Sequence, residues 1–167
     1  MKLIIFDLDG VLVKAKKMHF KALNEALENI DPKFSISYSE HLNTYDGLKT
    51  RDKLNLLTQL KGLSALDHDK VWKKKQEITS QKVKEIKKDK HLIRLLEFLA
   101  ENNIKIACCS NSIRKSVYSI LAQLGLINFF DYILSNEDVK NSKPYPEMYW
   151  KAMMFFATNP EETLIVE

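Results

Sequence analysis

The feature that most constrains the fold of this chain is a short apolar run that ends in two aspartates. Residues 3–6 are all apolar and lead directly into Asp7-Leu-Asp-Gly. Such a continuous run is typical of a buried strand in a parallel sheet. Because alternate strand residues point the same way, Asp7 and Asp9 are expected to converge just beyond the strand, where open α/β sheets bind ligands. Two adjacent carboxylates repel unless a cation or a proton relieves them, although a plain Asp-x-Asp-Gly turn remains the alternative.

The rest of the chain separates into a helical stretch and an alternating stretch. Residues 15–88 show helical patterns on both sides of a polar stretch at 35–44 and no predicted strand. Their last helix is expected to run from a cap at Asp67 or Asp69 to about Lys88. After residue 88, helical patterns alternate with short apolar runs, at 91–102, 104–109, 112–124, 132–134, 146–157 and 163–166. This alternation indicates a parallel sheet. We therefore predict an α/β fold whose Rossmann-like core, residues 1–14 and 89–167, is interrupted by an all-helical domain, residues 15–88.

Composition is that of an ordinary globular protein. The 167 residues are 45% hydrophobic and 29% charged, which suits one domain with a small insertion. No apolar run approaches the ~20 residues of a membrane span, and the N-terminus has no signal-peptide pattern. The adjacent Cys108 and Cys109 cannot close a useful disulfide loop, which fits a reducing compartment. We expect a cytoplasmic protein without membrane contact, and the modest net charge of +4 gives no indication of nucleic-acid binding.

Polar residues also follow the other predicted strands. Ser110-Asn111 comes just before a helix, where a hydroxyl, an amide and free backbone N–H groups favour an anion. Lys143 lies in a proline-stiffened loop after strand 132–134, and Glu167 follows strand 163–166. Taken singly, Ser110-Asn111 is more often a helix cap than an anion site, and a loop lysine such as Lys143 is more often solvated than bound to a ligand. Because parallel strands end at the same edge, the four sites together predict a phosphate site.

In this order, the motifs Asp7-Leu-Asp-Gly-Val, Ser110-Asn111 and Lys143-Pro resemble those of the haloacid dehalogenase-like (HAD-like) hydrolase superfamily. The resemblance is to its β-phosphoglucomutase and phosphatase branch, and covers the chain including an inserted helical cap. It implies that Asp7 is the nucleophile that forms an aspartyl-phosphate and that Asp9 is the general acid and base. Ser110 would then hydrogen-bond the transferring phosphoryl group, with Asn111 beside it, and Lys143 would neutralise its charge.

The resemblance also implies a Mg²⁺ cofactor. Its expected ligands are the Asp7 carboxylate, the Asp9 backbone carbonyl and the acidic pair of the family's fourth motif. Glu167 matches the first residue of that pair, and the sequence ends before the second. We therefore expect a core shortened at its C-terminus, with weak Mg²⁺ binding and little activity from this chain by itself.

Substrate contacts are implied both in the core and in the cap. The candidate substrate-binding residues are Gly10, His19, Gly47, Thr50, Lys75 and Asn111. His19 resembles a histidine that contacts the acid–base aspartate in mutase-like members. Thr50 stands where a mutase's substrate-binding arginine is expected, and Arg51 comes one position later. This departure counts against mutase specificity.

Three functional hypotheses follow for this chain. The leading one is a Mg²⁺-dependent phosphatase that acts on a small phosphomonoester, with sugar phosphates among the candidates. The second is a phosphosugar mutase, which His19 and the helical cap favour. The third is a non-catalytic binding domain, which the incomplete fourth motif favours. The substrate and the oligomeric state are left open by the sequence.

Overall fold

The computed structural model describes all 167 residues and divides into two compact units. Residues 1–14 and 86–167 form the core unit, and residues 15–85 form the helical unit. The core unit is thus built from two separate pieces of sequence. Each unit has its own hydrophobic cluster and is described by itself.

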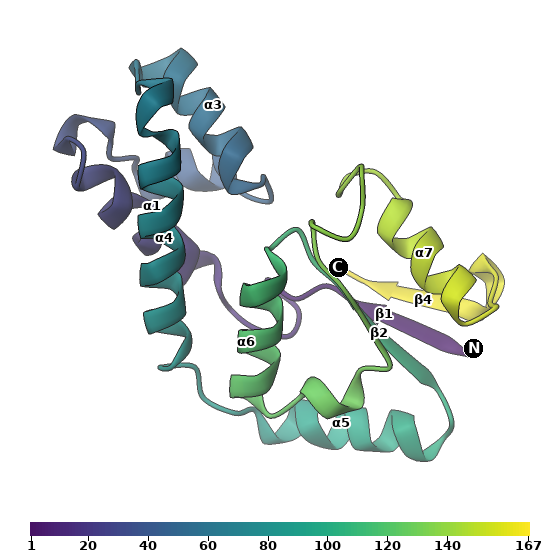
Figure 1. Cartoon of the computed structure of the whole chain (residues 1–167). Helices are drawn as coiled ribbons and strands as arrows, with labels where there is room; N and C mark the ends of the chain where they lie inside the picture. Colours follow the sequence, from purple (N-terminus) through teal and green to yellow (C-terminus); the bar gives the residue numbers. More distant parts are fainter. The chain divides into compact units, whose positions relative to one another are not determined.

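The core unit contains one parallel four-stranded sheet with the strand order β3-β2-β1-β4. The strands are β1 (Leu3–Phe6), β2 (Lys105–Cys109), β3 (Tyr132–Leu134) and β4 (Thr163–Val166). The first and last strands of the sequence lie side by side, with Ile5 opposite Ile165 (Figure 1). The predicted α/β fold with a parallel sheet is confirmed. All four strands therefore present their carboxyl ends at one edge.

Helices cover both faces of this sheet, which explains the apolar run at its centre. The helices are α5 (Lys90–Glu101), α6 (Arg114–Leu124) and α7 (Glu147–Phe155). Figure 1 shows α5 and α6 on one side of the sheet and α7 on the other. Ile5 packs with Met148 and Ala152 of α7, whereas its neighbours in β1 face the other side. All four residues of β1 are consequently buried, so its sequence shows no polar alternation.

The helices of the core unit begin and end at identifiable signals. The Asp89 carboxylate caps α5, because its Oδ1 accepts from the backbone N–H groups of His91 at 2.8 Å and Leu92 at 3.3 Å. Gly125 ends α6 in the left-handed region with φ of 74°, where a side chain would be strained. Short 3-10 turns, η4 (Ile127–Phe129) and η5 (Pro160–Glu162), lead into β3 and β4.

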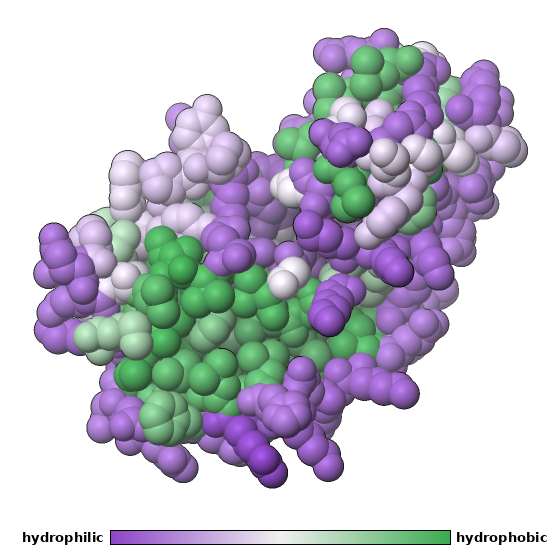
Figure 2. All heavy atoms as spheres, turned by 180° about the vertical axis from the view of Figure 1, so that it is seen from behind, coloured by the Kyte–Doolittle hydropathy of each residue, from purple (hydrophilic) through white to green (hydrophobic).

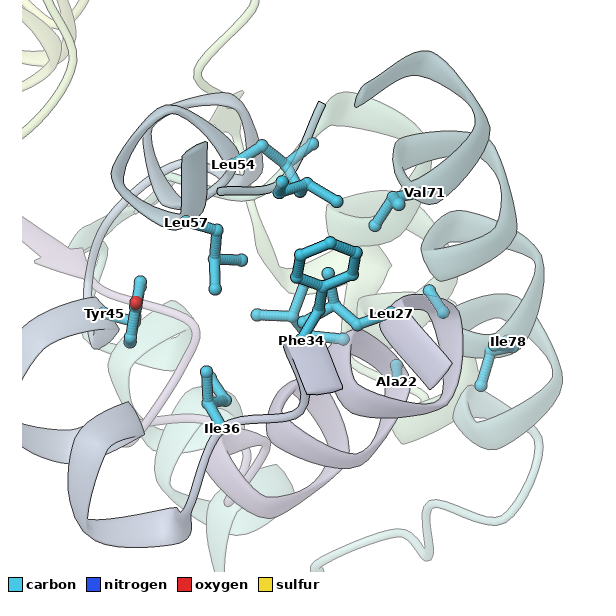
Figure 3. Packing of buried hydrophobic residues seen from close by; sticks show 12 residues of the cluster. Ala22, Leu27, Phe34, Ile36, Tyr45, Leu54, Leu57, Val71 and Ile78 are labelled. Atoms are coloured by element: carbon cyan, nitrogen blue, oxygen red, sulfur yellow. The ribbon is translucent and has the colours of Figure 1, made fainter. Parts of the chain in front are cut away.

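The helical unit packs around its own apolar centre. Its helices are α1 (Lys16–Glu28), α2 (Tyr38–Glu40), α3 (Thr50–Lys61) and α4 (His68–Val83), with the 3-10 turns η1 (Pro32–Phe34) and η3 (Ala65–Asp67) and the π-helical segment η2 (His41–Tyr45). Figure 3 shows Phe34 among side chains that converge from α1, α3 and α4, including Leu27, Leu54 and Val71. No strand occurs in this unit.

The last helix of this unit differs from its sequence prediction. α4 ends at Val83, its last buried apolar residue, and not near Lys88. The lysine-rich stretch that follows has no further buried residue to hold it against the cluster. Asp67 occupies the N-cap position but its side chain makes no capping hydrogen bond, and Asp69 pairs with Arg51 instead. The prediction that either aspartate caps α4 through its side chain is therefore wrong.

Apolar side chains are also exposed on the core unit. They include Leu95 and Phe98 of α5 and Leu164 and Ile165 of β4, each at least 40% exposed. Figure 2 shows a broad apolar area surrounded by polar side chains on one face. β4 is an edge strand, so its side chains have a neighbouring strand on one side only. None of the helices is long and apolar enough to cross a membrane.

Candidate active site

A tight turn after β1 places the two aspartates of the first motif. Asp7 continues the pairing with β4, because its N–H donates to the Val166 carbonyl at 2.8 Å. The chain then folds back, and the Gly10 N–H donates to the Val13 carbonyl at 2.8 Å. Gly10 has φ of 111°, a conformation that only glycine adopts without strain. The glycine of the motif thus allows the turn that follows Asp9.

Lys143 joins the ends of two strands through ion pairs. Its Nζ lies 2.8 Å from Asp7 Oδ1 and 2.6 Å from Glu167 Oε1. The Lys143 and Asp7 side chains are only 12% and 15% exposed. Tyr149 borders the group, since its ring centroid lies 5.4 Å from Nζ and its hydroxyl donates to Glu167. The lysine predicted to neutralise charge therefore sits between two carboxylates at the sheet edge.

The protonation of this group follows from burial and charge together. Burial alone would lower the pKa of Lys143, but the Asp7 and Glu167 carboxylates outweigh it and raise that pKa above its ordinary value. Burial raises the pKa of Asp7, and the Lys143 ammonium acts in the opposite direction. Lys143 consequently carries its positive charge throughout the neutral pH range.

The Asn111 side chain holds the backbone of the lysine loop. Its Nδ2 donates to the Lys143 carbonyl at 3.0 Å, and its Oδ1 accepts from the Lys143 N–H at 3.0 Å. The Asn111 carbonyl in turn accepts from Asn136 Nδ2 at 2.8 Å. One amide thus binds both polar groups of a single peptide residue 32 positions away. The sequence places Asn111 in the site but does not predict this contact.

Two serines occupy the turn between β2 and α6. Ser110 is buried, and its Oγ accepts from the Ser112 N–H at 3.0 Å. The Ser112 hydroxyl donates to Asp9 Oδ2 at 3.0 Å. Sequence reasoning missed Ser112. The available signal was a second hydroxyl two residues after Ser110, in the same turn from strand to helix.

The oxygen atoms at this edge fit a hard divalent cation. Asp7 and Glu167 supply two carboxylates that already lie close to one positive charge, and the Asp9 backbone carbonyl is near in sequence. Oxygen donors of these types suit Mg²⁺. The chain has no cluster of three or more His, Cys, Asp or Glu side chains in metal-binding arrangement. Asp7 and Glu167 are therefore the two side chains of this chain that could serve as ligands here.

The other candidate substrate residues belong to the helical unit. His19 lies on α1, Gly47 in an exposed turn with φ of 73°, Thr50 at the first position of α3, and Lys75 on α4. Their contact with a substrate stays a prediction.

Arg51 is already engaged within the helical unit. Its Nη1 donates to Asp69 Oδ1 at 2.6 Å, and its guanidinium lies over the Trp72 ring, 5.3 Å from the centroid. Paired and stacked in this way, the guanidinium has less freedom to bind a second anion. The Arg51 guanidinium is thus directed toward Asp69 and Trp72.

The adjacent cysteines contribute packing to the core unit. Cys108 and Cys109 are fully buried in β2. Burial raises the pKa of Cys109 to about 12, and that of Cys108 well above its ordinary value. Because the thiolate is the nucleophilic form, neither cysteine is activated for catalysis near neutral pH.

Two aspartates two residues apart, a serine and a lysine at one sheet edge are the groups expected of a phosphoryl-transfer site. A family model described as haloacid dehalogenase-like hydrolase matches residues 4–167, and the chain belongs to this family. The predicted membership is confirmed.

Relatives of this chain include phosphatases and a phosphomutase. It is 28% identical to a phosphorylated carbohydrates phosphatase of Thermotoga maritima, over 100% of this chain and 76% of the relative. It is 27% identical to a β-phosphoglucomutase of Bacillus subtilis, over 100% of this chain and 75% of the relative. CbbY from Rhodobacter sphaeroides, solved in complex with phosphate, superposes with a TM-score of 0.88 at 19% identity, over 99% of this chain and 76% of that one. At that identity the superposition shows a shared fold.

Proposed function

We propose that this protein is a Mg²⁺-dependent phosphatase of small phosphomonoesters, with sugar phosphates as the favoured substrate class. The observation that carries the proposal is the Lys143 ammonium held against the Asp7 carboxylate at the carboxyl edge of the sheet. A phosphoryl group needs positive charge beside its attacking atom more than it needs covalent help. The similarity to a carbohydrate-phosphate phosphatase supports the substrate class.

In the first half of the proposed reaction, Asp7 is the nucleophile. One of its carboxylate oxygens attacks phosphorus, and the bond from phosphorus to the leaving oxygen breaks. Asp9 donates its proton to that oxygen, and the alcohol departs. Lys143 balances negative charge on Asp7 and on the phosphoryl oxygens, while Ser110 and the backbone N–H groups before α6 hydrogen-bond those oxygens.

In the second half, water replaces the alcohol. Asp9, now ionised, takes a proton from water as the water attacks phosphorus, and Asp7 departs as the free carboxylate. A Mg²⁺ ion held by Asp7, Glu167 and the Asp9 carbonyl would supply further positive charge for the phosphoryl oxygens. Asn111 keeps Lys143 in place through its two hydrogen bonds to the loop backbone.

A phosphosugar mutase is the second candidate, and the relative that is 27% identical favours it. Thr50 and the engaged guanidinium of Arg51 favour the phosphatase, because neither offers the cap arginine expected of a mutase. Incubation with β-glucose 1-phosphate and a sugar bisphosphate primer separates the two. Isomerisation without release of phosphate would rule out the phosphatase.

The direct test measures phosphate release from p-nitrophenyl phosphate and from sugar phosphates at millimolar Mg²⁺. We expect Asp7→Asn to abolish release, a loss of at least about 1000-fold, because the amide is no nucleophile. Asp131→Asn is the matched control, since Asp131 is exposed and precedes β3 at the opposite end of the strands. The assay uses the full-length protein. A full-length wild-type protein that releases no phosphate, or an active Asp7→Asn variant, would leave the non-catalytic binding hypothesis in its place.

A further inference from the structure

We propose that Ser112 is a positioning residue that orients the Asp9 carboxylate toward the leaving oxygen of the substrate. The contact that carries this inference is the hydrogen bond from Ser112 Oγ to Asp9 Oδ2, 3.0 Å long, between residues 103 positions apart. The inference rests on the proposed function, because it assigns a task within the proton transfer of Asp9.

The Ser112 hydroxyl is itself held by its surroundings. The Ser112 N–H donates to Ser110 Oγ at 3.0 Å, and the Ser112 carbonyl accepts from the Asn136 N–H at 3.2 Å. Its backbone is thereby tied both to the turn after β2 and to the loop after β3. Because its backbone is held at two points, the Ser112 hydroxyl approaches Asp9 from a defined direction.

The contact is not the usual task of a serine at a helix start. Such a serine commonly caps the helix by accepting from a backbone N–H in the first turn. Here Ile113 is the N-cap of α6, and the N–H of Arg114, the first residue of the helix, donates to the Glu137 carboxylate at 2.7 Å. The Ser112 hydroxyl instead leaves its own turn to reach a carboxylate on the loop after β1. Helix capping therefore does not account for this residue.

Orientation matters because an aspartate rotates about two torsions and presents two oxygens. A hydrogen bond at Oδ2 restricts both torsions and so limits the directions in which the carboxyl group can exchange its proton with the substrate. Small errors in the placement of a catalytic group cost large factors in rate. Loss of the Ser112 hydroxyl should therefore weaken acid catalysis specifically, while Asp7, Lys143 and phosphoryl binding are retained.

The experiment compares two substrates whose leaving groups differ in how much they depend on protonation by the general acid. A sugar phosphate expels a basic alkoxide and requires the acid, whereas p-nitrophenyl phosphate expels a weakly basic phenolate and requires it much less. For Ser112→Ala we expect kcat/KM for the sugar phosphate to fall about 10- to 100-fold more than kcat/KM for p-nitrophenyl phosphate. Ser112→Thr, which keeps a hydroxyl, should restore most of the difference.

Ser119→Ala on α6 is the matched control, and it should leave both substrates unaffected. Thermal unfolding of each variant shows whether the fold is retained. Equal losses on the two substrates, or no loss, would overturn the positioning role while leaving the proposed phosphatase intact. A full-length wild-type protein that hydrolyses neither substrate at millimolar Mg²⁺ would overturn the proposed function and this inference together.

Discussion

At the scale of single residues, the Asn111 side chain holds the backbone of Lys143 in place. A planar amide carries a donor and an acceptor, and here both are used on the two polar groups of Lys143. The lysine is brought from a loop to a carboxylate 136 positions away in the sequence. Without the amide, the loop would retain the lysine but not its exact position.

We therefore predict that Asn111→Ala lowers kcat about 10- to 100-fold, because a shift of about 1 Å in a catalytic group costs a factor of this size. Steady-state kinetics with p-nitrophenyl phosphate measure the loss. Asn102→Ala is the matched control, because Asn102 bonds only an exposed helix end, through the Phe98 carbonyl. An unchanged kcat would show that the clamp on Lys143 is dispensable.

His41 is the second residue whose environment departs from its usual one. It is 1% exposed in the π-helical segment of the helical unit, and its ring lies against Phe20 and Tyr38. Burial lowers the pKa of His41 to about 4. Of the charged groups that face it, Lys53, His19 and Lys16 lower the pKa further, and Asp46, 4.0 Å away, raises it.

This histidine should make stability depend on pH. In the unfolded chain it binds a proton near its ordinary pKa of 6.5, but in the folded chain only near 4. Its contribution is therefore present above pH 6.5 and is lost as the pH falls toward 4. Between pH 7 and pH 5 the loss should be about 2 kcal/mol. Urea unfolding followed by circular dichroism should show this loss in the parent and not in His41→Phe; identical slopes would contradict it.

At the scale of elements, an aspartate at the N-cap position of a helix does not always make a capping hydrogen bond. Asp89 and Asp67 both occupy N-cap positions, of α5 and α4 respectively. Asp89 has an extended backbone, which turns its side chain back onto the first N–H groups of α5. Asp67 has helical dihedrals instead, because η3 runs directly into α4. The sequence shows an aspartate before a helix in both cases.

The two aspartates should consequently differ in stability. We predict that Asp89→Ala costs about 1 kcal/mol of unfolding free energy, because two backbone donors lose their acceptor. Asp67→Ala should cost less than about 0.5 kcal/mol, as is usual for substitutions that remove no specific contact. Urea titration of the two variants provides the comparison. Equal losses would mean that charge near the helix start, and not the capping bond, sets the effect.

At the scale of the whole molecule, the two units carry separate clusters and one tryptophan each. Trp72 packs against the cluster of the helical unit, whereas Trp150 lies on α7 of the core unit. Trp150→Phe therefore leaves a fluorescent reporter of the helical unit alone. This distribution allows the stability of one unit to be followed within the intact chain.

In that background, Leu57→Ala should lower the unfolding free energy reported by Trp72 by about 2–5 kcal/mol, because Leu57 is fully buried and its removal leaves a cavity. Leu60→Ala, at an exposed position of the same helix, is the control and should change it little. A loss of similar size in both variants would contradict the view that burial in the cluster of Figure 3 sets the effect.

Periodicity and local signals in the sequence determined the α/β fold, the strands at 132–134 and 163–166, and the glycine ends of helices such as Gly125. These features depend on neighbouring residues, because burial of a strand or helix face repeats at a fixed spacing. The rule that parallel strands end at one edge likewise predicts that Asp7, Ser110 and Lys143 lie close together.

Only the tertiary structure decided which atoms of those residues meet. The bonds from Ser112 to Asp9 and from Asn111 to Lys143 join segments 103 and 32 residues apart, and no local pattern encodes them. The same holds for Arg51, whose guanidinium turns to Asp69 and Trp72. The sequence by itself determined which groups stand at the sheet edge, whereas side-chain orientation and pairing required the packed fold, because they depend on which distant segments packing brings into contact.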